Sequence, residues 1–288
     1  MSYTYTIQQL DDSFYSICDV HSVNMYLIIG EKRALLFDTG FGFLDLRELL
    51  GGLTDMPIIA IDSHADPDHA LGNYLFEDVY LSRYDYKNLL LLDGPAFKRS
   101  QLDYRLNKPE SKLAEEMGDV EAWMAHSVFE SRYHFVDEGD SFDLGGTRLE
   151  VVALPGHTTG SIALIDRSRK RVFTGDSVMD HNVYYMDIAD APQRSYEPLS
   201  VYYDSLRRLR TMVDDNYLLY PAHGPMGISA SAIDDALVNL QQIHEREGEE
   251  TELVTSLGYP CFRHVFGTSE ILYSSSNVEV YRKGALLQ

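Results

Sequence analysis

Four side chains of the kind that bind metal ions follow one short apolar run in this sequence. Residues 58–61 read Ile-Ile-Ala-Ile, and the next eight positions contain the four candidates, His64, Asp66, Asp68 and His69. Imidazole and carboxylate groups together suit zinc, iron or manganese. Pro67 lies between the two aspartates and fixes one backbone angle, which favours a loop that is rigid before an ion arrives. Taken alone, the cluster predicts a metal site, a solvated loop or a helix cap.

Three later stretches favour the metal site. Each places a histidine or an aspartate beside Gly or Pro at the end of an apolar run, and the three residues are His157, Asp176 and His223. Loops that follow the strands of a scaffold are where functional side chains are usually presented. The sequence therefore predicts that several loops contribute ligands to one site.

In order and spacing, these stretches resemble the metallo-β-lactamase superfamily. Its hallmark is His-x-His-x-Asp-His, followed by a distant His, a bridging Asp and a last His, and the resemblance covers roughly residues 26–223. The upstream run 35–40, Leu-Leu-Phe-Asp-Thr-Gly, also matches the first motif of that family. The resemblance implies an α/β fold, a four-layer αββα sandwich whose ligands come from loops at one sheet edge.

The resemblance also implies a site with two divalent metal ions, for which zinc is the first expectation and iron or manganese the alternatives. Carried over motif by motif, the first ion would take His64, Asp66 and His157. The second ion would take Asp68, His69 and His223, and Asp176 would bridge the two. Asp68 is also expected to act in catalysis, and Asp38 to hold the ligand loop by hydrogen bonds. Two further candidates close to the metals or the substrate are His181 and Tyr184.

Such a site implies a hydrolase in which a metal-bound hydroxide cleaves an ester, thioester or lactone-type small-molecule substrate. Two alternatives remain open. One is a diiron redox or oxygen-reducing protein, and the other is a non-catalytic metal-binding member of the superfamily. The metal content of the purified protein would discriminate between them, because iron favours the redox protein and zinc the hydrolase.

Asp66 departs from the family pattern, which usually has its second histidine at this position. A third carboxylate makes the site one unit less positive, so a bound water should be less acidic than with imidazole there. We therefore expect Asp66→His to move the activity optimum to lower pH, as measured by the pH–rate profile of kcat/KM. A profile that the substitution leaves in place would contradict this idea.

The 288 residues are predicted to form a single domain, residues 1–288, with a helical insert at about 83–131 and a C-terminal tail at about 250–288. Apolar or alternating runs predict strands at 14–18, 24–29, 33–37, 58–61, 133–136, 148–154, 161–165, 171–174 and 217–220. The segment 177–197 is rich in Tyr and Asp and is expected to be a long irregular loop beside the site. The apolar tail is expected to dock on the body or on a second subunit, which makes a homodimer possible.

Composition and charge exclude several classes of partner. A formal net charge of −21 opposes binding to nucleic acid or to an anionic membrane. No apolar run approaches the roughly 20 residues that span a bilayer, and residues 1–6 have neither a basic start nor an apolar segment. The two cysteines, Cys18 and Cys261, form no CxxC pair. These features predict a cytoplasmic protein that acts on a small molecule.

Overall fold

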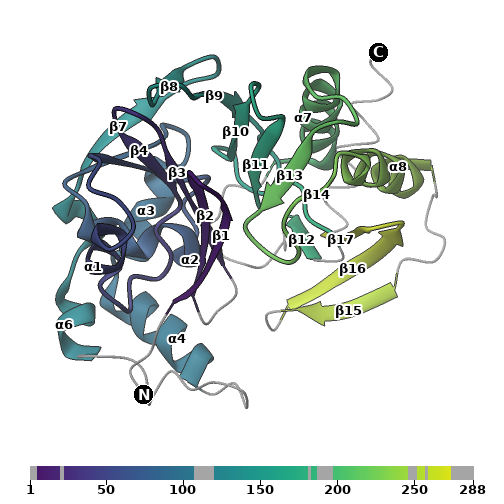
Figure 1. The fold of residues 1–288 in the computed structure, drawn as a ribbon. Helices are drawn as coiled ribbons and strands as arrows, with labels where there is room; N and C mark the ends of the chain where they lie inside the picture. The colour runs from purple at the N-terminus through teal and green to yellow at the C-terminus, as the bar shows by residue number, and fades with distance from the viewer. Residues whose placement is uncertain are drawn as a thin grey trace. The chain divides into compact units, whose positions relative to one another are not determined.

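The computed structural model describes residues 5–19, 23–106, 120–180, 183–186, 197–245, 252–256 and 259–273. The chain divides into two compact units (Figure 1). The N-terminal unit comprises Met1–Val136 and Phe142–Arg148, and the C-terminal unit comprises Asp137–Ser141 and Leu149–Gln288. That residues 1–288 form a single domain stays a prediction.

The N-terminal unit is built on a seven-stranded sheet whose strands lie in sequence order. They are β1 (Thr6–Asp11), β2 (Phe14–Cys18), β3 (Asn24–Ile29), β4 (Ala34–Phe37), β5 (Ile58–Ile61), β6 (Asp78–Ser82) and β7 (Arg132–Val136). The pairs from β1 to β4 are antiparallel, and those from β4 to β7 are parallel. Strands β4 to β7 therefore end at one edge of the sheet, and the loop with four predicted ligands begins there.

Helices cover the apolar side chains of this sheet. Helix α1 (Leu46–Gly51) begins at Asp45, whose side chain accepts hydrogen bonds from two backbone N–H groups of the first turn. After the ligand loop come α2 (Pro67–Ala70) and a 3₁₀ turn, η1 (Leu71–Leu75). Between β6 and β7 lie α3 (Tyr86–Leu92), α4 (Pro95–Leu106), α6 (Val120–Ala125) and η2 (Val128–Glu130). The predicted mixed α/β fold and helical insertion are thus confirmed.

The helical insertion packs directly on the ligand loop. Ala65 of that loop belongs to one buried cluster with Phe41, Phe43 and Trp123. The Trp123 indole stacks at a tilt on Phe43, with ring centroids 4.7 Å apart, and its N–H donates to the Phe41 carbonyl at 3.0 Å. The insertion therefore contributes to the rigidity of the loop.

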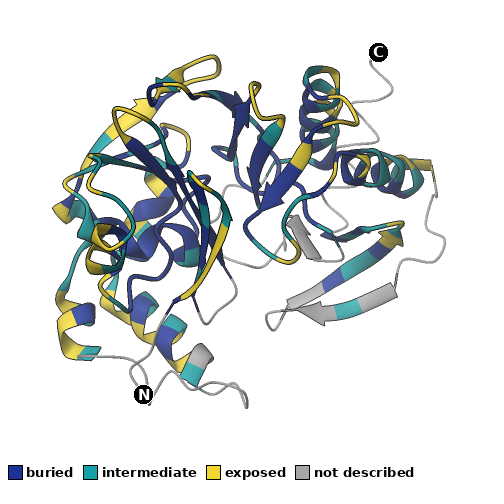
Figure 2. Ribbon diagram, in the orientation of Figure 1, coloured by how far each residue is buried: buried dark blue, intermediate teal, exposed yellow. Residues whose placement is uncertain are grey.

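A six-stranded sheet has the order β14-β13-β11-β10-β9-β8 and belongs to the C-terminal unit, except for residues 142–143 of β8 and Arg148 of β9. The strands are β8 (Ser141–Asp143), β9 (Arg148–Ala153), β10 (Ile162–Asp166), β11 (Arg171–Gly175), β13 (Leu218–Pro221) and β14 (Ile228–Ser229). Helices α7 (Leu199–Met212) and α8 (Ser231–Glu245) lie side by side (Figure 1). Each helix buries one stripe of side chains and exposes the opposite face, as Figure 2 shows.

A second sheet of this unit corrects the expectation for residues 177–197. That segment is not irregular throughout, because β12 (Val183–Met186) pairs in parallel with β17 (Ser269–Tyr273). The sheet continues through β16 (Tyr259–Phe266) to β15 (Glu252–Ser256). The described part of the predicted tail therefore docks within its own unit, where β16 and β17 contact α8. Among the described residues, every helix is too short or too polar to cross a membrane.

Candidate metal centre

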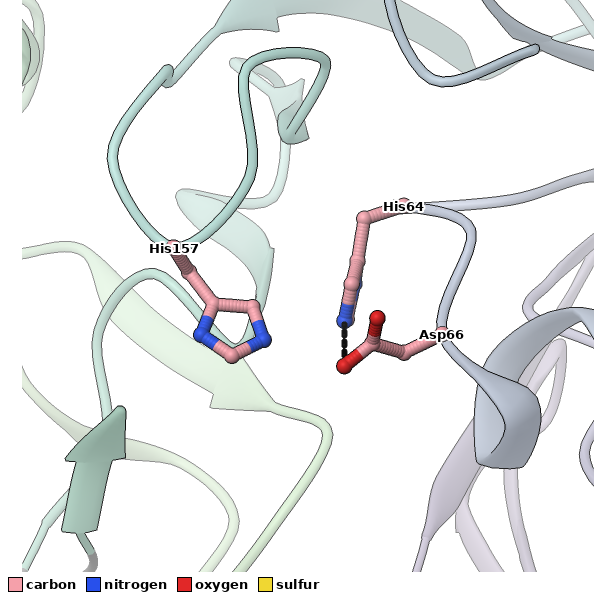
Figure 3. A group of neighbouring side chains, drawn as sticks. All are labelled: His64, Asp66 and His157. Atoms are coloured by element: carbon pink, nitrogen blue, oxygen red, sulfur yellow. Dashed lines mark ion pairs between the residues drawn. The ribbon is translucent and has the colours of Figure 1, made fainter. Parts of the chain in front are cut away.

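The first four predicted ligands lie on the loop after β5, in the N-terminal unit. Helix α2 begins at Pro67 with Asp66 as its N-cap residue, so Asp68 and His69 occupy its first turn. His64 Nε2 lies 3.7 Å from Asp66 Oδ2, and His69 Nε2 lies 3.8 Å from Asp68 Oδ1. Figure 3 shows the first of these pairs, together with His157 on its own loop.

The donor set and its spacing fit a metal ion. Both distances exceed those of a hydrogen bond, whereas two ligand atoms on one tetrahedral ion are about 3.4 Å apart. His64 and His69 are 1% and 0% exposed, and Asp66 is 8% exposed. One carboxylate and two imidazoles at this depth are costly to desolvate, and a bound cation would offset that cost.

Asp38 and Ser63 orient the two imidazoles of this loop. Asp38 is fully buried and accepts hydrogen bonds from Ser63 N at 2.6 Å, Ser63 Oγ at 2.9 Å and His69 Nδ1 at 2.9 Å. Because the Ser63 hydroxyl donates to Asp38, its oxygen is left to accept from His64 Nδ1, which lies 2.9 Å away. Both histidines would then present the lone pair of Nε2, the form that binds a metal.

Asp38 itself has a backbone φ of 67°, in the left-handed region that non-glycine residues rarely adopt. Such a conformation persists only where the surrounding contacts hold it, and it is frequent at functional sites. The structure thus places Asp38 against the ligand loop as predicted, and its role stays a prediction.

Two further buried carboxylates support the loop and were not among the predicted residues. Asp62 Oδ2 accepts from Asn73 Nδ2 at 2.7 Å, and Asp85 Oδ2 accepts from the backbone N–H of Ala65 at 2.8 Å. Asn73 in turn accepts from Thr39 Oγ1 at 2.7 Å. The position of Asp62 directly after the apolar run of β5 is a signal that could have found it.

Asp62 gives a prediction about stability and pH. Burial raises the pKa of its carboxyl well above the usual range, and the hydrogen bond from Asn73 only partly opposes this. Above about pH 4 the unfolded chain therefore loses this proton while the folded protein keeps it, so the folded state loses stability as pH rises. We therefore expect the free energy of unfolding of Asp62→Asn to increase relative to that of wild type as pH rises. Urea denaturation of the metal-free proteins at pH 5 and pH 8 measures this difference, with the exposed Asp55→Asn as control. A difference between Asp62→Asn and wild type that is the same at both pH values would contradict the prediction.

The other three predicted ligands lie in the C-terminal unit, on the loops after β9, β11 and β13. Strands β11 and β13 run in parallel, so their carboxyl ends share one edge, and Ala222 N donates to the Gly175 carbonyl at 3.0 Å. Asp176 Oδ2 lies 3.8 Å from His157 Nε2, and Asp176 Oδ1 lies 3.5 Å from His223 Nε2. Asp176 therefore faces one imidazole with each of its oxygens, and its role as a bridge between two ions stays a prediction.

Two predicted residues cannot be placed in this way. His181 lies outside the described residues. The backbone of Tyr184 belongs to β12, and its side chain lies outside what the structure describes. Apart from these two residues, each unit brings its own predicted ligands together. That the two sets form one complete site remains a prediction.

Comparisons with known proteins show the family and the fold of this chain. The family "Metallo-beta-lactamase superfamily" matches residues 18–223. An acyl-coenzyme A thioesterase, MBLAC2 of Gallus gallus, is 30% identical over 205 residues, which are 66% of this chain and 68% of that protein. The mitochondrial persulfide dioxygenase ETHE1 of Bos taurus is 30% identical over 100 residues, 35% of this chain and 37% of that protein. Among solved structures, a metallo-β-lactamase from Pontibacter korlensis is 18% identical with a TM-score of 0.57, covers 83% of this chain and 99% of its own, and shows the fold alone.

Proposed function

Since this chain belongs to the metallo-β-lactamase superfamily, and is on that ground a metal-dependent hydrolase, we propose that it hydrolyses a thioester of a small molecule. The choice of a thioester as the bond that is cleaved rests on the thioesterase among its relatives. The match covers 66% of this chain and 68% of that thioesterase. A thiol is a good leaving group, because its pKa of about 8.5 lets it depart as a thiolate near neutral pH. The chemistry therefore does not depend on a strong general acid.

We propose that both sets of ligands meet at one binuclear centre. One ion would be held by His64, Asp66 and His157, and the other by Asp68, His69 and His223. The observation that supports this division is the pairing within each unit, since Asp176 faces His157 with one oxygen and His223 with the other. The loop after β5 also presents two pairs, one for each proposed ion. His64 lies 3.7 Å from Asp66, and His69 lies 3.8 Å from Asp68.

The residues of the chain would have distinct tasks at this centre. Bound divalent ions, zinc by first expectation, would acidify a water and polarise the thioester carbonyl. Asp38 and Ser63 would hold His69 and His64 in the ligating tautomer. The Asp68 side chain is 23% exposed while that of His69 is buried, so we assign Oδ2 of Asp68 the further task of accepting the proton from the attacking water.

Removing the metal tests the proposal directly. Protein dialysed against a chelator is expected to lose thioester hydrolysis by at least about a hundredfold, and to regain it with about two equivalents of zinc per chain. The assay compares an acyl thioester with the oxygen ester and the lactone of matched acyl length. Hydrolysis that survives complete removal of metal would contradict the mechanism, and a preference for the lactone would contradict the substrate class.

A second candidate is an iron-dependent redox reaction. It is favoured by the third carboxylate, Asp66, a harder ligand than imidazole, and by the relative named persulfide dioxygenase. Protein purified without added metal or chelator discriminates between the two. About two zinc ions with thioesterase activity favour the hydrolase, whereas iron with oxygen uptake on a persulfide favours the redox reaction.

The proposed setting is cytoplasmic, with a small-molecule substrate and without nucleic acid or membrane as a partner. The formal charge of −21 supports the exclusion of anionic partners. A homodimer stays a proposal that sedimentation of the purified protein would test.

A further inference from the structure

Two of the ligand loops in the C-terminal unit rest on the same side chain, Tyr202 of α7. Tyr202 is fully buried, and its hydroxyl donates to the Ser177 carbonyl at 2.6 Å. Its ring packs on Gly156, where a Cβ would lie only 2.5 Å from the ring Cδ2 and 2.9 Å from Cγ. Ser177 directly follows Asp176, and Gly156 directly precedes His157. One tyrosine therefore touches the neighbours of two predicted ligands.

A second contact fixes α7 to the same loop. Ser205, on the same buried stripe of α7, donates from Oγ to the Pro155 carbonyl at 2.8 Å. The backbone N–H of Glu197, just before the helix, donates to the Gly156 carbonyl at 3.2 Å. The loop that carries His157 is thus held against α7 at Pro155 and at Gly156. Its distance from the Asp176 loop is then set by the tyrosine that lies between them.

We propose that Tyr202 is a positioning residue that sets the spacing between His157 and Asp176, and through it the affinity for the ion that these two ligands share. The inference rests on the proposed function. Tyr202 acts by two contacts of different kinds, a hydrogen bond to the Asp176 loop and a close packing contact on the His157 loop. Its ring is a spacer of fixed length, whereas a metal site tolerates errors of only a few tenths of an ångström in the position of its ligands.

The test is the affinity of the metal-free, full-length chain for cobalt(II), whose visible absorption reports ligand geometry. Tyr202→Phe keeps the ring and removes the hydroxyl. We expect one of the two cobalt ions to bind about tenfold more weakly and its absorption bands to change. Tyr5→Phe is the matched control, because the Tyr5 hydroxyl also donates to a backbone carbonyl, that of Leu44, on a segment without predicted ligands. This control should leave the cobalt affinity and spectrum unchanged.

Gly156→Ala tests the packing contact separately, since the added methyl group must displace the Tyr202 ring or the loop. Gly156→Ala is expected to weaken binding of the same ion. It also takes the place of Tyr202→Phe as the test variant if circular dichroism shows that Tyr202→Phe does not fold. A folded Tyr202→Phe or Gly156→Ala chain with wild-type cobalt affinity and spectrum would overturn the inference and leave the proposed function intact. A wild-type chain that binds no cobalt would instead overturn the proposed function, and the inference with it.

Discussion

Asp176→Ala is expected to lower kcat/KM for thioester hydrolysis about a thousandfold, which corresponds to about 4 kcal/mol of transition-state stabilisation. The reason is that the two carboxylate oxygens of Asp176 face different imidazoles, at 3.8 Å for His157 and 3.5 Å for His223. Loss of this side chain would remove one ligand from each of the two proposed ions. We therefore also expect the metal content to fall below two ions per chain.

Steady-state kinetics and elemental analysis of the same preparation measure both effects. Asp214→Ala is a suitable control, because Asp214 is an exposed aspartate of the same unit that pairs with Lys170 and lies away from the ligand loops. It should retain both ions and the wild-type rate. If Asp176→Ala kept two ions and a rate within tenfold of wild type, the bridging role would be wrong. If it lost the ions but kept the rate, the metal-dependent mechanism would be wrong as well.

Much of the fold could be predicted because its strands have strong local signals. Strands β3, β4 and β5 are short apolar runs bounded by polar or Gly-containing segments, and β3 and β4 are buried almost throughout. Strand β1 was not predicted, because it is largely exposed at the edge of its sheet and has no apolar face. The sequence predicts a loop where β12 lies, since its partner β17 is far along the chain and local pattern carries no information on such a pairing.

The candidate ligands could be predicted for a different reason. Side chains such as His157 and Asp176 directly follow a Gly in loops after strands, where their types and order are visible in the sequence. The residues that hold them are not visible in this way. Ser63, Asn73 and Tyr202 are ordinary polar or aromatic residues, and their roles depend on tertiary contacts with loops 10 or more positions away. Only Ser63 adjoins a ligand, and a serine next to a histidine is too common to be a signal.

Asp38→Ala is expected to weaken metal binding by about 10- to 100-fold and to lower the free energy of unfolding by about 3 kcal/mol. Asp38 is fully buried, and its carboxylate accepts from Ser63 N, Ser63 Oγ and His69 Nδ1. Alanine would leave these donors without their acceptor, which accounts for the loss of stability. It would also free the His69 ring to change tautomer or rotate, which accounts for the loss of affinity. Urea denaturation of the metal-free protein and zinc competition titration measure the two effects.

The chain offers a closely matched control in Asp166, which is 1% exposed. Its Oδ1 accepts from Ser168 N at 3.0 Å, Ser168 Oγ at 2.6 Å and Arg169 N at 3.0 Å, at the turn between β10 and β11. Asp166→Ala therefore also removes an acceptor from one serine hydroxyl and two further N–H groups, but at a place without predicted ligands. Both variants should lose stability, and only Asp38→Ala should lose zinc affinity. Equal loss of affinity in the two would show that general destabilisation, rather than the orientation of His69, weakens the metal site.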